Sequence, residues 1–359
     1  MIQFIAKRVL YGVLVLAGVV TIVFLLFNVL PGDPARMLMG QRADEESLKI
    51  IQKDLGLDQP LSKQFVMYLN DLSPVSFHNT DPDHYLYLDK EKYDDYSELF
   101  TYGETGVAVF KTPYLRRSYT TKRKVSETMA DYMLETAVLA LASIIIAAFI
   151  GVLFGVFSAL NKDTWLDRAL LFFSVLGMSV PSFYSAIIIS WFFGFVIGDF
   201  TGLNMTGSLF EYDDLGNGEM IRLDNLILPA LTLGLRPVSA IMQLTRSSML
   251  DVMSQDYIRT ARAKGLRLWV VVIKHALKNA LNPVVTAISG MFASLLAGAL
   301  FVEWVFGWKG IGWVLFDALT KFDLPIVMGG VLLTATIFVV INILVDITYG
   351  LLDPRIRVK

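Results

Sequence analysis

The stretch VLYGVLVLAGVVTIVFLLFNVL, from Val9 to Leu30, carries no charged side chain and directly follows the basic pair Lys7 and Arg8. A helix needs about 20 mostly apolar residues to cross the hydrocarbon core of a bilayer, so this stretch is long enough to span it. It ends in Pro31-Gly32-Asp33-Pro34 rather than at a small-residue cleavage site. We therefore predict an uncleaved anchor helix over residues 1–30 and not a secretory signal.

Further apolar runs of similar length follow the first one. They extend roughly over Tyr132–Leu160, Ala169–Ile197, Leu226–Leu250, Pro283–Phe306 and Ile326–Leu351. The chain of 359 residues is 55% hydrophobic and only 18% charged, which is more apolar than a soluble domain of that length can bury. The sequence predicts an all-α integral membrane protein with six transmembrane helices.

Basic residues gather at alternate connections between these spans. They are Lys7 and Arg8, then Lys162 and Arg168, then Arg259, Arg262, Lys264, Arg267, Lys274 and Lys278, then Arg355, Arg357 and Lys359. Because Lys and Arg near span ends are retained in the cytoplasm, we expect both termini there. This orientation gives a large external segment at 31–130 and a five-helix core at 131–351. The core carries a cytoplasmic loop at 251–282 and is followed by a cytoplasmic tail at 352–359.

Small residues and prolines indicate how the spans pack. Small residues recur every four positions at Ala147, Gly151, Gly155 and Ala159 in the second span, and at Gly290, Ser294 and Gly298 in the fifth. Such stripes allow close contact between helix backbones. Pro181, Pro229 and Pro237 lie within or at the entry of spans, where proline bends a helix.

Composition excludes several other functions. The formal charge of −2 gives no basis for nucleic-acid binding, which needs a clear excess of Lys and Arg. There is no cysteine, and His78 and His84 lie in polar sequence where we expect solvated surface residues rather than metal ligands. No Gly-x-x-x-x-Gly-Lys-Ser/Thr phosphate loop occurs, so we expect the chain to bind no cofactor and to hydrolyse no ATP itself.

The stretch between the fourth and fifth spans is basic and cytoplasmic in this orientation. Residues Asp256 to Lys264 predict a short helix, with an acidic residue in its first turn and Gly265 at its end. A second helix is expected to resume toward His275. Periodicity alone leaves open whether this stretch is a docking element or only a solvated connection.

At this point the sequence closely resembles the membrane subunits of bacterial ABC importers for dipeptides, oligopeptides and, in some relatives, nickel or glutathione. The resemblance covers nearly the whole chain. Its motifs are Leu30–Pro34, Leu55–Pro60, Ser179–Phe183, Leu228–Ala230, Thr245–Gly265, His275–Pro283, Glu303–Phe306, Asn342–Asp346 and Leu352–Arg357. Any one of these strings could arise by chance, whereas all of them in order over six spans are a specific signal of the family.

The resemblance implies an ABC importer type I permease fold in which the cytoplasmic loop forms a coupling helix near Asp256 to Leu268. That helix would dock on a separate ATPase subunit, and Gly265 matches the family's glycine. The implied docking residues are Asp256, Tyr257, Arg259, Thr260, Ala261, Arg262, Ala263, Lys264, Gly265, Leu266 and His275. Small Ala261 and Ala263 would allow close approach, and Arg262 and Lys264 would meet acidic groups on the partner.

The same resemblance implies the remaining partners and the location. They are a second homologous permease subunit, two ATPase subunits that bind ATP and Mg, an external substrate-binding protein and the lipid of a bacterial inner membrane. Di- or oligopeptides are the implied cargo, with nickel chelates or glutathione as alternatives. Pairing with a sister subunit is favoured over self-pairing.

Two stretches depart from the family's pattern. Where relatives often have Trp-Pro-Gly-Leu-Gly, this chain has Trp308-Lys309-Gly310-Ile311-Gly312, which leaves the shape of that outer turn open. About 40 residues are inserted at roughly Ser73 to Leu115, well beyond ordinary loop lengths, and they are rich in Asp and Tyr. This insertion either folds over the outer mouth, or contacts the substrate-delivering protein, or is a solvated loop.

Ionisable and polar residues inside the spans are the remaining candidates, because charges at membrane depth are costly. Arg236, Gln243, Glu303, Asn342 and Asp346 are the residues concerned. Arg236 either lines the substrate path or belongs to a buried structural pair, and Glu303 and Asp346 are expected first as packing and hydrogen-bonding groups.

Other transport or enzyme classes fit the sequence less well. An intramembrane hydrolase needs a nucleophile with a base, and Ser179, Ser182 and Ser185 have no intramembrane His or Lys. A channel would need a selectivity filter, which is not visible. A secondary transporter would suit kinked helices but would leave the coupling motif without a role.

Overall fold

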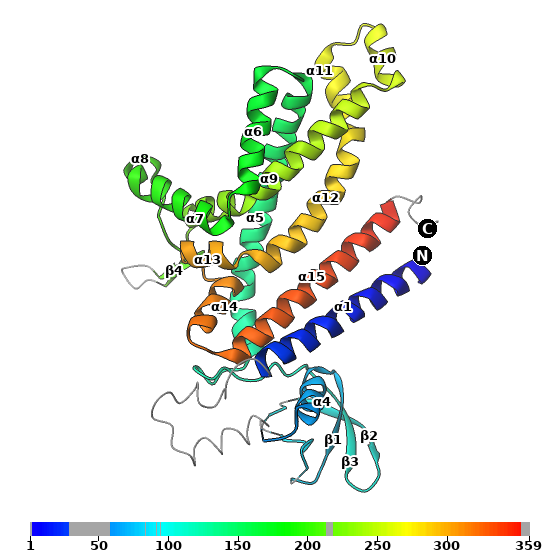
Figure 1. The fold of residues 1–359 in the computed structure, drawn as a ribbon, viewed down its shortest axis with the longest axis vertical. Helices are drawn as coiled ribbons and strands as arrows, with labels where there is room; N and C mark the ends of the chain where they lie inside the picture. Colours follow the sequence, from blue (N-terminus) through cyan, green and yellow to red (C-terminus); the bar gives the residue numbers. More distant parts are fainter. Residues whose placement is uncertain are drawn as a thin grey trace. The chain divides into compact units, whose positions relative to one another are not determined.

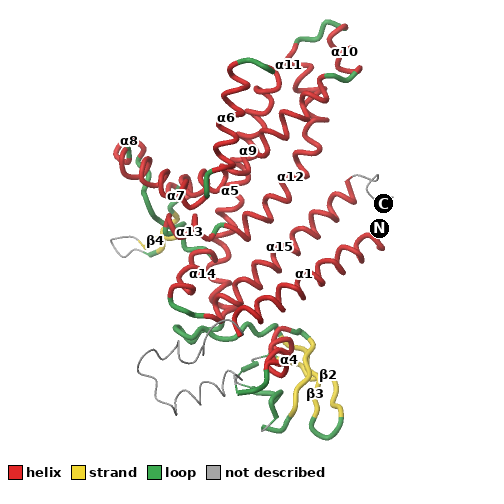
Figure 2. Tube along the Cα trace, in the orientation of Figure 1, coloured by secondary structure: helices red, strands yellow, loops and turns green. Residues whose placement is uncertain are grey.

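The computed structural model describes residues 2–28, 58–82, 84–90, 92–93, 95–212 and 218–352. The Leu30–Pro34 motif, the first half of Leu55–Pro60 and the tail from Asp353 lie outside the described residues. The chain divides into a helical unit, which is Met1–Val15, Tyr132–Phe316 and Thr334–Lys359, and a mixed unit, which is Leu16–Asp131 and Asp317–Leu333. Figure 1 traces the fold by residue number, and Figure 2 separates helices from strands.

Helices dominate the described chain, as the sequence predicts. Five of them are long and apolar enough to cross a membrane, and the number is six if one bent pair counts as a single span. The long helices are α1 (Ile2–Asn28), α5 (Val125–Leu160), α9 (Asp224–Met253), α12 (Leu277–Gly298) and α15 (Leu324–Leu352). The bent pair consists of α6 (Trp165–Ser179) and α7 (Ser182–Trp191).

The third predicted span is broken rather than straight. The axes on either side of the break differ by 109°. Pro181 lies at the break with an extended backbone, φ −59° and ψ 137°, immediately before α7. Proline has no N–H to donate to the helical hydrogen-bond pattern, so the bend expected at Pro181 is a full break between two helices. A π-helical segment η2 (Phe192–Val196) and the short α8 (Gly198–Thr201) follow.

The fifth span begins earlier than predicted. Helical structure starts at α11 (Leu268–Val270), continues through the π-helical segment η3 (Val271–Ala276) and enters α12 without a break. Pro283 therefore lies inside a helix and does not open one. The predicted cytoplasmic loop at 251–282 reduces to the short helix α10 (Asp256–Ala263) and its flanking turns. After α12 come α13 (Leu300–Phe306) and α14 (Ile311–Thr320).

The predicted small-residue stripe of the second span makes close contacts, whereas Gly290 of the fifth-span stripe makes none with a described residue. A Cβ added to Gly151 would lie 2.8 Å from the Ile241 side chain, and one added to Gly155 would lie 2.5 Å from Thr245. Helix α5 thus packs directly on α9, as predicted. A Cβ on Gly290 would meet no described atom within 4 Å, so this member of the fifth-span stripe makes no close contact with the described residues.

Helix directions within the helical unit agree with the predicted orientation. Gly151 of α5 lies against Ile241 of α9, and Gly155 lies against Thr245, so the contacts advance in the same direction along both helices. Helices α5 and α9 therefore run parallel, as the second and fourth spans must. In the opposite arrangement, Arg8 of α1 pairs with Asp346 of α15 at 3.2 Å, while Gly12 approaches Val339 and Ile343. Helices α1 and α15 therefore run antiparallel there. The start of α1 lies beside the end of α15, as expected if both chain termini are on the same side of the membrane.

The insertion is folded, which the sequence does not predict. In the mixed unit, α4 (Leu61–Leu72) precedes a three-stranded antiparallel sheet in the order β1 (Val75–Asn79), β3 (Gly106–Lys111), β2 (Tyr96–Tyr102). Leu88, Tyr93, Val107 and Val109 form its buried core. The all-α description therefore holds only for the spans, and a contact of the insertion with the substrate-delivering protein stays a prediction. A second, two-stranded pair, β4 (Phe210–Tyr212) and β5 (Glu219–Ile221), lies in the helical unit.

Candidate functional site

The predicted cytoplasmic helix exists and ends where the sequence indicates. Gly265 has φ +73°, a left-handed conformation that glycine adopts without steric cost. The Gly265 N–H donates to the Arg262 carbonyl at 2.9 Å, and the Leu266 N–H donates to the Ala261 carbonyl at 3.4 Å. These two bonds form a Schellman motif, which satisfies the last carbonyls of α10 and turns the chain sharply.

Helix α10 has one face buried in its own chain and one face exposed. Ile258 is fully buried and Ala261 is 7% exposed. The exposed predicted docking residues are Asp256, Tyr257, Arg259, Thr260, Arg262, Ala263, Lys264, Gly265 and Leu266. The role expected for Ala261 is therefore wrong, because its side chain packs inward; Ala263 remains available for close approach.

A compact apolar cluster supports the buried face of α10. Ile258 and Ala261 pack with Met249 at the end of α9, with Val272 in η3 and with Ala159 at the end of α5. The Asn279 amide also donates to the Tyr257 hydroxyl at 2.8 Å. The helix is thus fixed to the ends of three spans, and a force on it is passed to those spans.

A hollow of about 510 Å³ lies beside α10 and gives its surface a concave part. Leu160, Leu250 and Met253 provide an apolar floor, and Lys162 and Arg262 line it as charged groups. Arg259 pairs with Asp256 at 3.5 Å, but both side chains are strongly exposed, so this pair stabilises the helix little. The exposed face is basic overall and suits an acidic partner surface. His275 lies apart from this face, half-buried in η3.

A buried ion pair near this region was not predicted from the sequence. Arg246 of α9 donates to both carboxylate oxygens of Asp167 in α6, each at 2.7 Å, and the Ser158 hydroxyl of α5 also donates to Asp167. The Asp167 side chain is only 2% exposed. Arg246 lies inside the fourth predicted span, where a charge is costly, but Asp167 precedes the third predicted span, so the sequence did not mark the two as partners. It joins three helices close to α10.

The predicted path residues are not brought together. Arg236 is exposed and makes no ion pair with any described residue. Gln243, on the same helix, donates to the Ser174 hydroxyl at 2.9 Å and so ties α9 to α6. The buried-pair interpretation of Arg236 is wrong within the described chain.

Glu303 is a fully buried hydrogen-bonding group, as predicted. It accepts from the Thr136 hydroxyl at 2.8 Å and from the Trp313 N–H at 3.1 Å. A Cβ on Gly310 would lie 2.4 Å from the Glu303 carboxylate, so this turn requires glycine there. The carboxylate therefore shapes the outer turn that departs from the family's pattern.

The same turn shows what replaces the missing proline. The backbone N–H of Lys309 donates to the Ser208 hydroxyl at 2.8 Å, a bond that proline could not make. Ser208 in turn donates to the Glu135 carboxylate, and the Trp308 indole donates to the Glu135 carbonyl at 3.0 Å. Glu135 and Ser208 were not singled out from the sequence.

Asn342 and Asp346 serve packing and pairing. The Asn342 amide donates to the Phe338 carbonyl of its own helix at 2.8 Å, and Asp346 pairs with Arg8 at 3.2 Å. Asp346 thus lies level with the basic flank of the first span. His78 also departs from expectation, since it is 1% exposed inside the mixed unit and not a solvated surface residue. Within the described ranges, no group of three or more His, Cys, Asp or Glu side chains could hold a metal ion.

Comparison with known proteins shows the family to which the chain belongs. Residues 151–358 match the family described as binding-protein-dependent transport system inner membrane component, and residues 1–80 match that family's N-terminal model. The chain belongs to this family of ABC transporter permeases. It is a multi-pass component of the inner membrane and is not itself catalytic.

Curated relatives extend the match over the full chain. A dipeptide transport system permease protein of Alkalihalophilus pseudofirmus is 32% identical, over 99% of this chain and 100% of the relative. A glutathione transport system permease protein of Salmonella choleraesuis is 34% identical over the whole of both chains. A di/tripeptide transport system permease protein of Pseudomonas aeruginosa is 34% identical over 99% of each. The chain is therefore a permease of the peptide and glutathione branch.

Proposed function

We propose that this permease translocates di- or oligopeptides across the inner membrane and is driven by separate ATPase subunits that dock on α10. The observation that carries the coupling part is the two-sided character of α10. Ile258 and Ala261 fix the helix to its own chain, while Arg262, Lys264 and Leu266 stand exposed beside a hollow of about 510 Å³. A helix held in this way transmits displacement to the spans instead of swinging freely.

Docking would be electrostatic at its rim and apolar at its centre. The exposed cations of α10 favour an acidic groove, and Leu266, 40% exposed, offers an apolar contact. ATP and Mg would reside on the docked subunits and none on this chain. Closure of those subunits around ATP would push α10, and α9 and η3 would follow because they share its core.

A second permease subunit would complete the path. Arg236 is exposed on α9, and the bent segment presents Phe183, Tyr184 and Trp191 at its surface. Aromatic side chains such as these are enriched at protein contacts. In the complex, Arg236 would then line the path between the two permeases, where a cation suits the carboxylates of peptides.

The folded insertion would contact the external substrate-binding protein. Val75, Phe77 and Phe110 lie exposed on one face of the sheet, and the Tyr102 ring lies 6.0 Å from that of Phe77. Aromatic clusters on a surface are enriched at protein contacts. Replacing Phe77 and Phe110 by Ser should weaken binding-protein affinity without changing the fold, and unchanged affinity would remove this contact from the proposal.

Uptake by the assembled importer tests the choice of cargo. Proteoliposomes that contain the permease with its co-purifying subunits and binding protein would be given labelled dipeptide, labelled tetrapeptide or labelled glutathione with ATP. Saturable, ATP-dependent uptake of the unmodified peptides supports the proposal. Uptake of glutathione alone would replace it with the second candidate, which the Salmonella relative's name motivates.

A further inference from the structure

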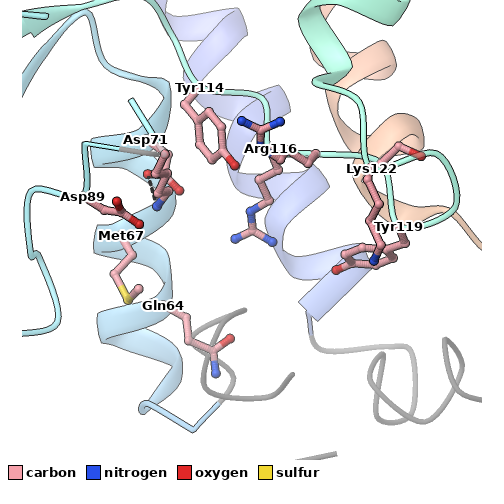
Figure 3. Close-up of a pocket in the computed structure, with 11 residues that line it drawn as sticks. Gln64, Met67, Asp71, Asp89, Tyr114, Arg116, Tyr119 and Lys122 are labelled. Carbon is pink, nitrogen blue, oxygen red and sulfur yellow. Dashed lines mark ion pairs between the residues drawn. The ribbon is translucent and has the colours of Figure 1, made fainter. Parts of the chain in front are cut away.

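The mixed unit contains a pocket that none of the roles above uses. Its volume is about 570 Å³, within the range of small-ligand sites. Figure 3 shows its walls, with Gln64, Met67 and Asp71 of α4 on one side and Tyr119 and Lys122 on the other. Arg116 lies between them. Every lining residue belongs to the mixed unit.

The pocket has an excess of positive charge. Four cationic side chains, Lys92, Arg116, Arg117 and Lys122, line it together with two carboxylates, Asp71 and Asp89. Lys92 pairs with Asp71 at 2.8 Å, and Asp71 also accepts from the Tyr93 hydroxyl. The Asp71 carboxylate is therefore already engaged. The four cations exceed the two carboxylates by two, so the pocket lining has a net charge of about +2 to meet an anionic ligand.

Arg116 and Lys122 differ from the other pocket cations in their pairing and in their backbone conformation. Among the described residues, neither makes an ion pair; the Arg116 guanidinium instead lies 5.5 Å from the centre of the Tyr68 ring. Both have left-handed backbones, with φ 69° for Arg116 and 60° for Lys122. Residues other than glycine seldom adopt this conformation, and those that do are concentrated at ligand clamps and active sites.

The loop that carries Lys122 is held in place before any ligand arrives. Asp323 accepts hydrogen bonds from the Ser118 hydroxyl, from the Tyr119 N–H at 3.0 Å and from the Thr120 N–H at 3.2 Å. The Lys122 N–H then donates back to the Ser118 carbonyl at 3.1 Å. A loop fixed in this way loses little conformational freedom on binding, which favours affinity.

We propose that this pocket binds a small carboxylate ligand of the size of a short peptide, with Arg116 and Lys122 holding the carboxylate. Arginine presents a planar fork that matches a carboxylate through two parallel hydrogen bonds. Tyr114, Tyr119 and Met67 supply the flanking apolar contacts. This site goes beyond the proposed translocation, because it lies outside the helical unit and needs no ATPase.

Binding is measured on the purified full-length permease in detergent, without the other subunits. Isothermal titration with glutathione, with Ala-Ala and with Ala-Ala amide separates carboxylate recognition from general peptide affinity. We expect the two acids to bind and the amide to bind about tenfold more weakly, which corresponds to the loss of one good charge-assisted contact. Binding of the acids should also weaken as salt shortens the screening length.

Variants assign the binding to these two cations. Arg116→Gln and Lys122→Gln should each weaken glutathione binding about tenfold, by the same conversion. Lys90→Gln is the matched control, since Lys90 is an exposed lysine of the same unit outside the pocket, and its binding should equal wild type. Lys122 is itself exposed, so its variant should retain the wild-type melting temperature even if Arg116→Gln does not.

Three results would overturn the proposal. One is the absence of binding by any of the three ligands up to about 10 mM, weaker than specific recognition requires. Another is equal binding of acid and amide, and the third is equal loss in the Lys90 control and the Lys122 variant. Because uptake is not part of this measurement, failure of the cargo assignment and failure of the pocket are distinguishable.

Discussion

The helical unit and the mixed unit differ in whether their cations are paired. In the helical unit, Asp167 and Arg246 neutralise each other completely between spans. In the mixed unit, the Asp71 carboxylate is engaged by Lys92 and Tyr93, while Arg116 and Lys122 line a pocket and make no ion pair with a described residue. In the helical unit paired charges thus tie helices together, whereas the mixed unit has cations that our proposal assigns to a ligand.

Removing one partner of the pair in the helical unit should give the largest effect. Arg246→Ala leaves the Asp167 carboxylate buried without its cation, and loss of one partner of a buried pair costs about 3–5 kcal/mol. We expect a large drop in the melting temperature of the detergent-purified permease. The double variant Asp167→Leu with Arg246→Met removes both charges and should melt close to wild type. Equal losses in the single and double variants would show that the pair contributes only packing.

Close packing in the same unit should give the next largest effect. Gly155→Leu forces a side chain against Thr245 and against the Met242 carbonyl, which lies 2.7 Å from the added Cβ. Overpacking of this kind costs about 1–3 kcal/mol, more when backbone must move. Gly290→Leu is the control in the isolated permease, because no described atom lies near it. If both variants melt alike, α5 does not pack on α9 as described.

The glycines of α5 and α12 also show what the sequence can and cannot predict. Gly151 and Gly155 were identified from spacing alone, because period four on a helix is a local property. Gly290 has the same spacing but no close contact with a described residue, since the tertiary arrangement decides which face of a helix meets a neighbour. The spans and their number follow from hydropathy, and the bend at Pro181 follows from proline chemistry, whereas the 109° angle there and the start at Leu268 depend on packing.

The candidate site was predicted to a similar extent. Gly265 and the limits of α10 follow from residue preferences and from the family resemblance. That Ala261 faces inward could not be predicted, because a short helix of eight residues gives too little periodicity to orient it. The Asp167–Arg246 pair and the sheet of the insertion both rest on contacts between distant residues, which single-sequence patterns do not contain.

Acidification should lower the free energy of unfolding of the mixed unit. Burial, together with the nearby Lys111 and Lys92, lowers the pKa of His78 to about 4, while Asp71 opposes this shift. The unfolded chain, with a His pKa near 6.5, binds the proton first, so stability is present above about pH 6.5 and is lost as the pH falls toward 4. After allowance for solvent screening we expect a loss of about 1–2 kcal/mol.

Hydrogen exchange in the mixed unit, followed from pH 7 to 4.5 and corrected for intrinsic rates, measures this loss. His78→Gln should flatten the dependence on pH, whereas replacing His84, whose ring accepts from the Leu86 N–H at 3.1 Å, should leave it unchanged. A dependence that persists in His78→Gln would assign it to other groups.

The most direct test of the account is whether α10 holds an ATPase subunit. The permease would be affinity-purified from native membranes in mild detergent as wild type, as Gly265→Arg, as the double variant Arg262→Glu with Lys264→Glu, and as Lys7→Glu. Gly265→Arg places a bulky side chain on a left-handed backbone, and the double variant reverses the exposed charge while leaving the cap intact. Lys7→Glu reverses an exposed charge outside the loop. The account predicts that an ATPase co-purifies with wild type and Lys7→Glu and is lost from both loop variants. An ATPase retained by both loop variants, or absent from wild type, would contradict it.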